Sequence, residues 1–170
     1  MDQPVTTTTS KGILISLILI VIALVTYFLD MSNSTSTRYI SFAVFIIGII
    51  WSVNMYGKQI DFNATFGNYF AHGFKIAALV TAIMIIYVVI FIYLFPDVKE
   101  KGMEAARKSI EEKGGISQEQ INQSMEFTKK FFMVFVIAGT LLGYLIFGAI
   151  SALIGAAVTK KNPRPIEIDR

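Results

Sequence analysis

The sequence predicts an all-α integral membrane protein with four transmembrane helices and an extramembrane helical hairpin between the third and the fourth. Of its 170 residues, 54% are hydrophobic and 16% are charged, whereas about a quarter are charged in a typical soluble domain. The apolar residues form four segments without Asp, Glu, Lys or Arg, namely residues 12–29, 39–57, 76–96 and 131–159. A helix needs about 20 residues to cross a bilayer core of about 30 Å, and each segment meets or approaches that length.

The first apolar segment, residues 12–29, is predicted to be an uncleaved span rather than a signal peptide. It is longer than the roughly 7–15 apolar residues of a signal peptide. The bulky Tyr27, Phe28 and Leu29 also stand where a cleavage site needs small residues. Before this span, residues 1–11 are polar and Thr-rich, and we expect them to be disordered. The chain has no cysteine, which excludes disulfides, thiolate metal ligands and a cysteine nucleophile.

Residues 61–75 are predicted to form an amphipathic segment that leads from the second span, 39–57, into the third, 76–95. With Asp61 as the N-cap of a helix that begins at Phe62, one face of this helix is polar and another is rich in Phe. The polar face consists of Asp61, Thr65, Asn68, His72 and Lys75. We expect this segment to lie at the membrane surface or to bury its polar side among the helices.

His72 is the only histidine and therefore the first candidate for acid–base chemistry. Asp61 lies on the same predicted face but roughly 16 Å away along a helix, beyond the reach of a hydrogen bond. One histidine without neighbouring ligands also falls short of a metal site. These arguments favour an interfacial role for His72. A membrane enzyme that acts on a lipid-linked substrate at the Asp61–His72 face is kept as an alternative.

Residues 97–130 carry mixed charges and predict two short amphipathic helices that meet at Gly114 and Gly115. Ser117 and Gln120 have the spacing of a capping box at the start of the second helix. That helix is predicted to continue into the fourth span, 131–159.

The fourth span is rich in small residues at spacings of three and four. In lipid, such small-xxx-small pairs allow two helix backbones to approach closely. The residues expected to make this contact are Gly139, Gly143, Gly148, Ala152 and Gly155. The contact would lie within the chain or between subunits, and the pattern favours the first.

The interiors of the four spans contain no Asp, Glu, Lys, Arg or His, which argues against a pump coupled to ions or protons. A facilitator lined by hydroxyl and amide groups stays open, and its candidate residues are Ser52, Asn54, Thr81, Thr140 and Ser151. The basic tail, residues 161–170, favours an orientation with both termini in the cytoplasm.

The string IDFNATFGNYFAHGFKI at residues 60–76 forms an aromatic- and Gly-containing entry to the third span. Together with Pro96-Asp97, the charged hairpin and the Gly/Ala-rich last span, it resembles the domain-of-unknown-function family 4199, small bacterial membrane proteins found mainly in Bacteroidota. The resemblance covers most of the chain. The family has no assigned activity, and what the resemblance implies is a location in the bacterial inner membrane.

We therefore expect a non-enzymatic accessory or scaffolding subunit of a membrane complex. The chain combines a last span suited to helix packing with a projecting hairpin, and it has no recognisable constellation of catalytic, cofactor-binding or metal-binding residues. The expected partners are membrane lipids and a membrane protein or a second copy of the chain, with no nucleic acid. The alternatives are a small oligomeric channel or facilitator and the membrane enzyme described above.

Overall fold

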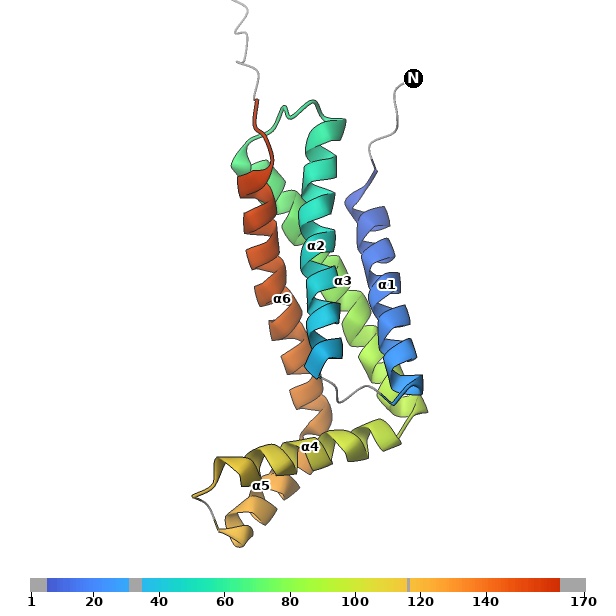
Figure 1. Ribbon diagram of the computed structural model, residues 1–170, viewed down its shortest axis with the longest axis vertical. Helices are drawn as coiled ribbons and strands as arrows, with labels where there is room; N and C mark the ends of the chain where they lie inside the picture. The colour runs from blue at the N-terminus through green and yellow to red at the C-terminus, as the bar shows by residue number, and fades with distance from the viewer. Residues whose placement is uncertain (1–5, 31–34, 116, 163–170) are drawn as a thin grey trace, which may run out of the picture. The chain divides into compact units, whose positions relative to one another are not determined.

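The computed structural model describes residues 6–30, 35–115 and 117–162, and the regular structure in this part of the chain is entirely helical. The helices in Figure 1 are α1 (Thr8–Phe28), α2 (Thr35–Gln59), α3 (Phe66–Leu94), α4 (Asp97–Lys113), α5 (Gln118–Lys130) and α6 (Phe132–Val158). Four of these, namely α1, α2 from Tyr39 onward, α3 and α6, are long and apolar enough to cross a membrane. The predicted fold class is confirmed, and the chain is a multi-pass membrane protein.

The chain divides into two compact units, one made of residues 1–84 and 142–170 and the other of residues 85–141. The first unit comprises α1, α2, the beginning of α3 and the end of α6. The second comprises the end of α3, the helices α4 and α5, and the beginning of α6.

Apolar side chains at helical spacing hold the four helices of the first unit together. The buried positions are Ile15 and Leu19 in α1, Phe45, Ile49 and Val53 in α2, Ile76, Ala77 and Val80 in α3, and Ala152 and Ala156 in α6. Two glycines allow α1 to approach its neighbours. A Cβ at Gly12 of α1 would lie 2.7 Å from Leu79 of α3, and one at Gly48 of α2 would lie 3.2 Å from Ile15. The core is therefore built by close helix–helix packing, as expected in lipid.

α1 begins before the apolar segment does. The backbone N–H of Ser10 donates a hydrogen bond of 3.2 Å to the Thr7 side chain, which is the N-cap of α1. Residues 8–11 therefore form the first helical turn, and the prediction that residues 1–11 are disordered is wrong for this part. Residues 1–5 lie outside the described residues.

The connection between α2 and α3 differs from the prediction. The backbone N–H of Phe62 donates to the Gly57 carbonyl at 2.7 Å and that of Asp61 donates to Lys58 at 3.4 Å, which is the Schellman pattern at the end of α2. Asp61 and Phe62 have φ values of 51° and 58°, in the left-handed region. Asp61 therefore ends α2, and the prediction that it caps a helix starting at Phe62 is wrong.

α3 begins at Phe66, where the backbone N–H of Asn68 donates a hydrogen bond of 3.4 Å to the Thr65 hydroxyl. From there the helix continues without interruption to Leu94. The amphipathic segment predicted for residues 61–75 is therefore, from Phe66, the first part of the third span.

In the second unit, α4 and α5 form the predicted hairpin. The turn contains Gly114 and Gly115, whose φ values of 64° and 81° suit glycine. The predicted capping box at the start of α5 is confirmed, because Ser117 N donates to the Gln120 side chain at 2.9 Å and Gln120 N donates to the Ser117 hydroxyl at 3.3 Å. A Cβ at Gly102 would lie 3.3 Å from the Phe132 ring, so α4 also packs closely on the start of α6.

Ion pairs at i,i+4 spacing line the exposed side of α4. Lys108 and Glu104 approach to 2.9 Å, as do Arg107 and Glu111. The hydrogen bond from Lys108 lowers the pKa of the Glu104 carboxyl and raises that of the Lys108 ammonium. Because such exposed pairs are screened by water, they contribute little to stability. This side of the hairpin is a solvated surface.

Candidate functional site

A polar cluster lies inside the first unit at the end of the bundle where α1 and α3 begin and α2 ends. It consists of Lys11 from α1, Ser52 and Tyr56 from α2, and Tyr69 and His72 from α3, and we call it the Lys11–His72 cluster. Only 4% of the Lys11 surface is exposed, and its ammonium donates a hydrogen bond of 3.2 Å to the Ser52 carbonyl. A buried ammonium in a membrane span is costly and rare, so Lys11 is the most unusual residue of this unit.

His72 is held by an aromatic stack. Its ring lies parallel to that of Tyr56, with 3.9 Å between centroids and 9° between planes, and Tyr56 meets Tyr69 edge-to-face at 6.1 Å. Tyr69 is fully buried. Within the described residues neither the Tyr69 hydroxyl nor His72 Nε2 has a hydrogen-bond partner, although both atoms are buried. The cluster therefore contains two buried polar atoms with unused hydrogen-bonding capacity.

The residues of the predicted polar face differ in their exposure. Asp61, Thr65, Asn68 and Lys75 are exposed, and only His72 is partly buried. Asp61 lies in the turn that ends α2, and Thr65 caps α3. Lys75, together with Lys11, is close enough to His72 to act on it electrostatically. Asp61 and His72 make no hydrogen bond or ion pair with each other in the described part of the chain, so the structure does not bring these two candidates together as a catalytic pair.

The cluster places hydrogen-bonding groups beside a positive charge, and no described carboxylate is paired with them. General acid–base catalysis by histidine usually relies on a carboxylate or a nucleophile within hydrogen-bonding reach, and no described acidic group bonds to His72 or Lys11. Among the described residues, no group of three His, Asp or Glu side chains is placed to hold a metal ion. What the cluster offers is spare hydrogen-bonding capacity beside a positive charge.

Three of the hydroxyl groups proposed as the lining of a conduit donate hydrogen bonds to their own helices. Ser52 donates to the Gly48 carbonyl at 2.7 Å, Thr81 donates to Ala77 at 2.7 Å, and Ser151 donates to Phe147 at 2.6 Å. All three residues are buried in the core. Hydroxyls in apolar helices commonly make such bonds to the carbonyl four residues back. The protons of these three hydroxyls are therefore engaged within their own helices and are not available to a permeating solute.

The small residues of α6 lie on two opposite faces. Gly148 follows Gly139 by nine residues. At about 100° per residue, this separation equals two and a half turns, so the two glycines point in opposite directions from the helix axis. One face carries Gly148, Ala152 and Gly155, which we call the inner face, and the opposite face carries Gly139 and Gly143, which we call the outer face. One neighbouring helix therefore cannot cover all five residues that were expected to make the contact, because the spacing between the two groups is that of opposite faces.

The inner face makes the expected close contacts. A Cβ at Gly148 would lie 2.5 Å from the Ala77 Cβ of α3, and one at Gly155 would lie 3.3 Å from the Ile50 Cα of α2. Ala152 is fully buried, and a Cβ at Gly73 of α3 would lie 2.9 Å from its Cβ. This half of the predicted contact lies within the chain.

The outer face behaves differently. In the described part of the chain, a Cβ at Gly139 or Gly143 would meet no atom within 4 Å. Next to Gly143, Tyr144 points inward and meets Phe45 of α2 edge-to-face at 4.9 Å. Ile146 and Ile150, further along the outer side, are 55% and 47% exposed. The expectation that Gly139 and Gly143 pack within the chain is therefore not met in the described structure.

Sequence reasoning missed Lys11, Tyr56 and Tyr69 as members of the cluster. Gly48 and Ser52 form a small-xxx-small pair that could have identified the packed side of α2. No comparable signal marks Lys11, because a lysine in the first turn of a span can extend to water as well as inward.

Comparison with known proteins gives one match. A family model described as "Protein of unknown function (DUF4199)" matches residues 11–161. No curated protein and no solved structure matches the chain.

Proposed function

The chain belongs to the family of proteins of unknown function DUF4199, and we propose that this member is a non-enzymatic accessory or scaffolding subunit of a membrane complex. The observation that carries the proposal is the outer face of α6. Gly139 and Gly143 have the Gly-xxx-Gly spacing that brings two helices together in lipid, and a Cβ at either position would meet no described atom within 4 Å.

The contrast along α6 supports a second helix as the occupant of the outer face. On the inner face, a methyl group at Gly148 would collide with Ala77 of α3, and one at Gly155 would press tightly against Val53 and Ile50 of α2. On the outer face, two glycines weaken the helix by about 1 kcal/mol each relative to alanine in a soluble helix, and the described residues provide no contact within 4 Å of an added Cβ to offset that cost. A helix of a partner, or of a second copy of this chain, would provide the missing contact.

The polar residues lend less support to the two alternatives. An enzyme at the Asp61–His72 face would need these groups to act together, whereas Asp61 ends α2 and His72 stacks on Tyr56. A conduit within one copy would need free polar groups along its path, whereas the hydroxyls of Ser52, Thr81 and Ser151 bond to their own helices.

The membrane and the orientation form part of the same proposal. The family resemblance supports the bacterial inner membrane. Lys160 and Lys161 directly follow α6, and Arg164 and Arg170 stand beyond them in the sequence. Such a basic cluster beside a span favours the cytoplasmic side, which would place both termini there and the α4–α5 hairpin on the opposite side.

The test is purification of the tagged full chain from its native membrane in a mild detergent, followed by mass spectrometry. We expect either a second membrane protein in a fixed ratio or, from cells with two differently tagged copies, co-purification of the second copy. A chain that is recovered as a monomer without a stoichiometric partner, under conditions that preserve other membrane complexes, would contradict the proposal.

A further inference from the structure

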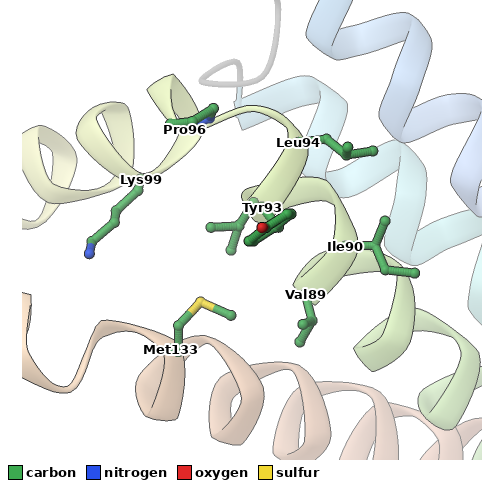
Figure 2. Close-up of a pocket in the computed structure, with 8 residues that line it drawn as sticks. Val89, Ile90, Tyr93, Leu94, Pro96, Lys99 and Met133 are labelled. Atoms are coloured by element: carbon green, nitrogen blue, oxygen red, sulfur yellow. The ribbon is translucent and has the colours of Figure 1, made fainter.

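The second unit contains an apolar cavity of about 590 Å³ where α3 gives way to α4. Its volume falls within the roughly 300–1,000 Å³ of pockets that bind small molecules. The lining is formed by Val89, Ile90, Ile92, Tyr93 and Leu94 of α3, by Pro96, by Lys99 of α4 and by Met133 of α6. Figure 2 shows these side chains around the cavity, with Lys99 as the charged residue among them.

The cavity lies at a boundary in the sequence between apolar and charged residues. The uncharged run of α3 ends at Phe95, Pro96 follows, and Asp97 opens the charged helix α4. Tyr93 is 86% exposed, and an exposed Tyr at the end of a span is typical of the membrane–water interface. This change from apolar to charged residues is the one expected where a span leaves the membrane core, at the level of the lipid headgroups.

Lys99 is the charged residue in the lining of the cavity. Its Nζ lies 5.7 Å from the centroid of the Phe132 ring, and within the described residues it makes no ion pair. Of the two carboxylates in the first turn of α4, Asp97 is engaged by Lys101 at 3.8 Å and Glu100 is exposed. No carboxylate of the described residues is therefore paired with Lys99, whose side chain lines the apolar cavity.

We propose that this cavity is a binding site for an acidic membrane phospholipid. An acyl chain fills the space between α3 and Met133, and the anionic headgroup lies beside the Lys99 ammonium. Both features are needed to name this ligand, because an apolar cavity alone accepts any acyl chain and a lone lysine attracts any anion. Basic pockets between helices at the membrane surface bind acidic headgroups in this manner. This inference does not depend on the proposed function, because it rests on the cavity and Lys99 and not on Gly139 and Gly143 of α6.

The headgroup preference is tested with the purified full chain in nanodiscs that contain equal amounts of phosphatidylglycerol and phosphatidylcholine. After transfer to detergent and washing, the retained lipids are quantified by mass spectrometry. We expect the wild type to retain phosphatidylglycerol in excess, and Lys99→Gln to lower this retention about fivefold while phosphatidylcholine is unchanged. Lys108→Gln removes the same charge from the same helix outside the cavity, and should behave as the wild type.

The cavity itself is tested with a filling substitution. Val89→Phe places a larger side chain in the space and should lower the retention of both lipids. Ile86→Phe makes the same kind of change at an exposed position of α3 that does not line the cavity, so it should retain lipid normally. Only variants with the elution profile of the wild type in size-exclusion chromatography are compared.

Three results would overturn the proposal. The first is retention of the two lipids in equal amounts by the wild type, and the second is an equal loss in Lys108→Gln and Lys99→Gln, which would indicate general surface attraction. The third is displacement of the retained phosphatidylglycerol by an excess of inorganic phosphate, which would indicate a site for a free anion rather than for a lipid.

Discussion

Lys11 and Ser52 illustrate how a charged side chain is accommodated inside an apolar bundle. Lys11 lies in the first turn of α1, its side chain is buried, and its ammonium donates a hydrogen bond of 3.2 Å to the Ser52 carbonyl of α2. A carbonyl offers a lone pair without a negative charge, so the ammonium is only partly compensated. We therefore expect Lys11 to add little to the free energy of unfolding.

We predict that Lys11→Met leaves the free energy of unfolding within about 1 kcal/mol of the wild type, because apolar replacement of a buried charge by a side chain of similar volume is often neutral or stabilising. Lys11→Glu should lower it by at least about 2 kcal/mol, because a carboxylate would face the Ser52 carbonyl. Thermal unfolding in detergent measures both. Equal losses in the two variants would show that the ammonium itself is required.

His72 yields a prediction that separates packing from chemistry. His72→Phe keeps a ring against Tyr56 but removes both nitrogens, and should retain the stability and the co-purifying partners of the wild type. His72→Ala should lower the free energy of unfolding by about 0.5–1.5 kcal/mol or more through loss of the stack. A His72→Phe variant that folds normally but fails to complement a deletion strain, in a strain where the deletion has a phenotype, would favour a chemical role.

At the scale of one element, α6 has one face that packs against the other helices of the chain and one face that does not. Burial along its last turns recurs at Gly148, Ser151, Ala152 and Gly155, a spacing of three and four that marks one face. The outer glycines lie half a turn away from this face. Because α2 and α3 can cover only one side of α6, the other side is left to lipid or to a partner.

The two faces predict opposite responses to the same substitution. Gly148→Ala places a methyl group 2.5 Å from the Ala77 Cβ, and overpacking of this kind costs about 1–3 kcal/mol. Gly143→Ala meets open space and should leave the thermal midpoint unchanged or slightly raised, since alanine favours the helix. The thermal midpoints of both variants in detergent test this pair of predictions. An equal decrease of the midpoint in both variants would place Gly143 in an intramolecular contact.

At the scale of the whole molecule, the sequence predicted the number and the approximate positions of the spans, because a long uncharged run has few alternatives to crossing a bilayer. It also predicted the hairpin and its capping box, since Gly114, Gly115 and Ser117 act locally. The Schellman turn at Asp61 was missed because Asp serves at both ends of helices, and only the backbone bonds to Gly57 and Lys58 distinguish them.

The candidate site was less predictable than the fold. The Lys11–His72 cluster unites residues of three helices, and helical periodicity within one segment does not reveal which side chain of another helix it meets. The division of the α6 glycines between two faces did not need the structure, because the angle between Gly139 and Gly148 follows from helix geometry alone. That correction was available from the sequence.

The proposed orientation can be checked with single cysteines in this Cys-free chain. Glu112→Cys, near the end of α4, should react with an impermeant thiol reagent in intact spheroplasts, and Lys160→Cys, just after α6, should react only after the membrane is permeabilised. Both positions are exposed, so neither substitution should disturb packing. The reverse pattern would place both termini outside.

The most direct test of the central claim compares Gly143→Leu with Gly155→Leu and Leu153→Ala, by thermal midpoint and by partner retention after purification in a mild detergent. Gly155→Leu collides with Ile50 and Val53 of α2 and should lower the midpoint. Leu153 is 45% exposed, so Leu153→Ala should keep the midpoint of the wild type. Gly143→Leu is predicted to keep the midpoint of the wild type and to lose the partner or the second copy. If Gly143→Leu retains both, the outer face of α6 contacts only lipid and the account of an accessory subunit held through this face is contradicted.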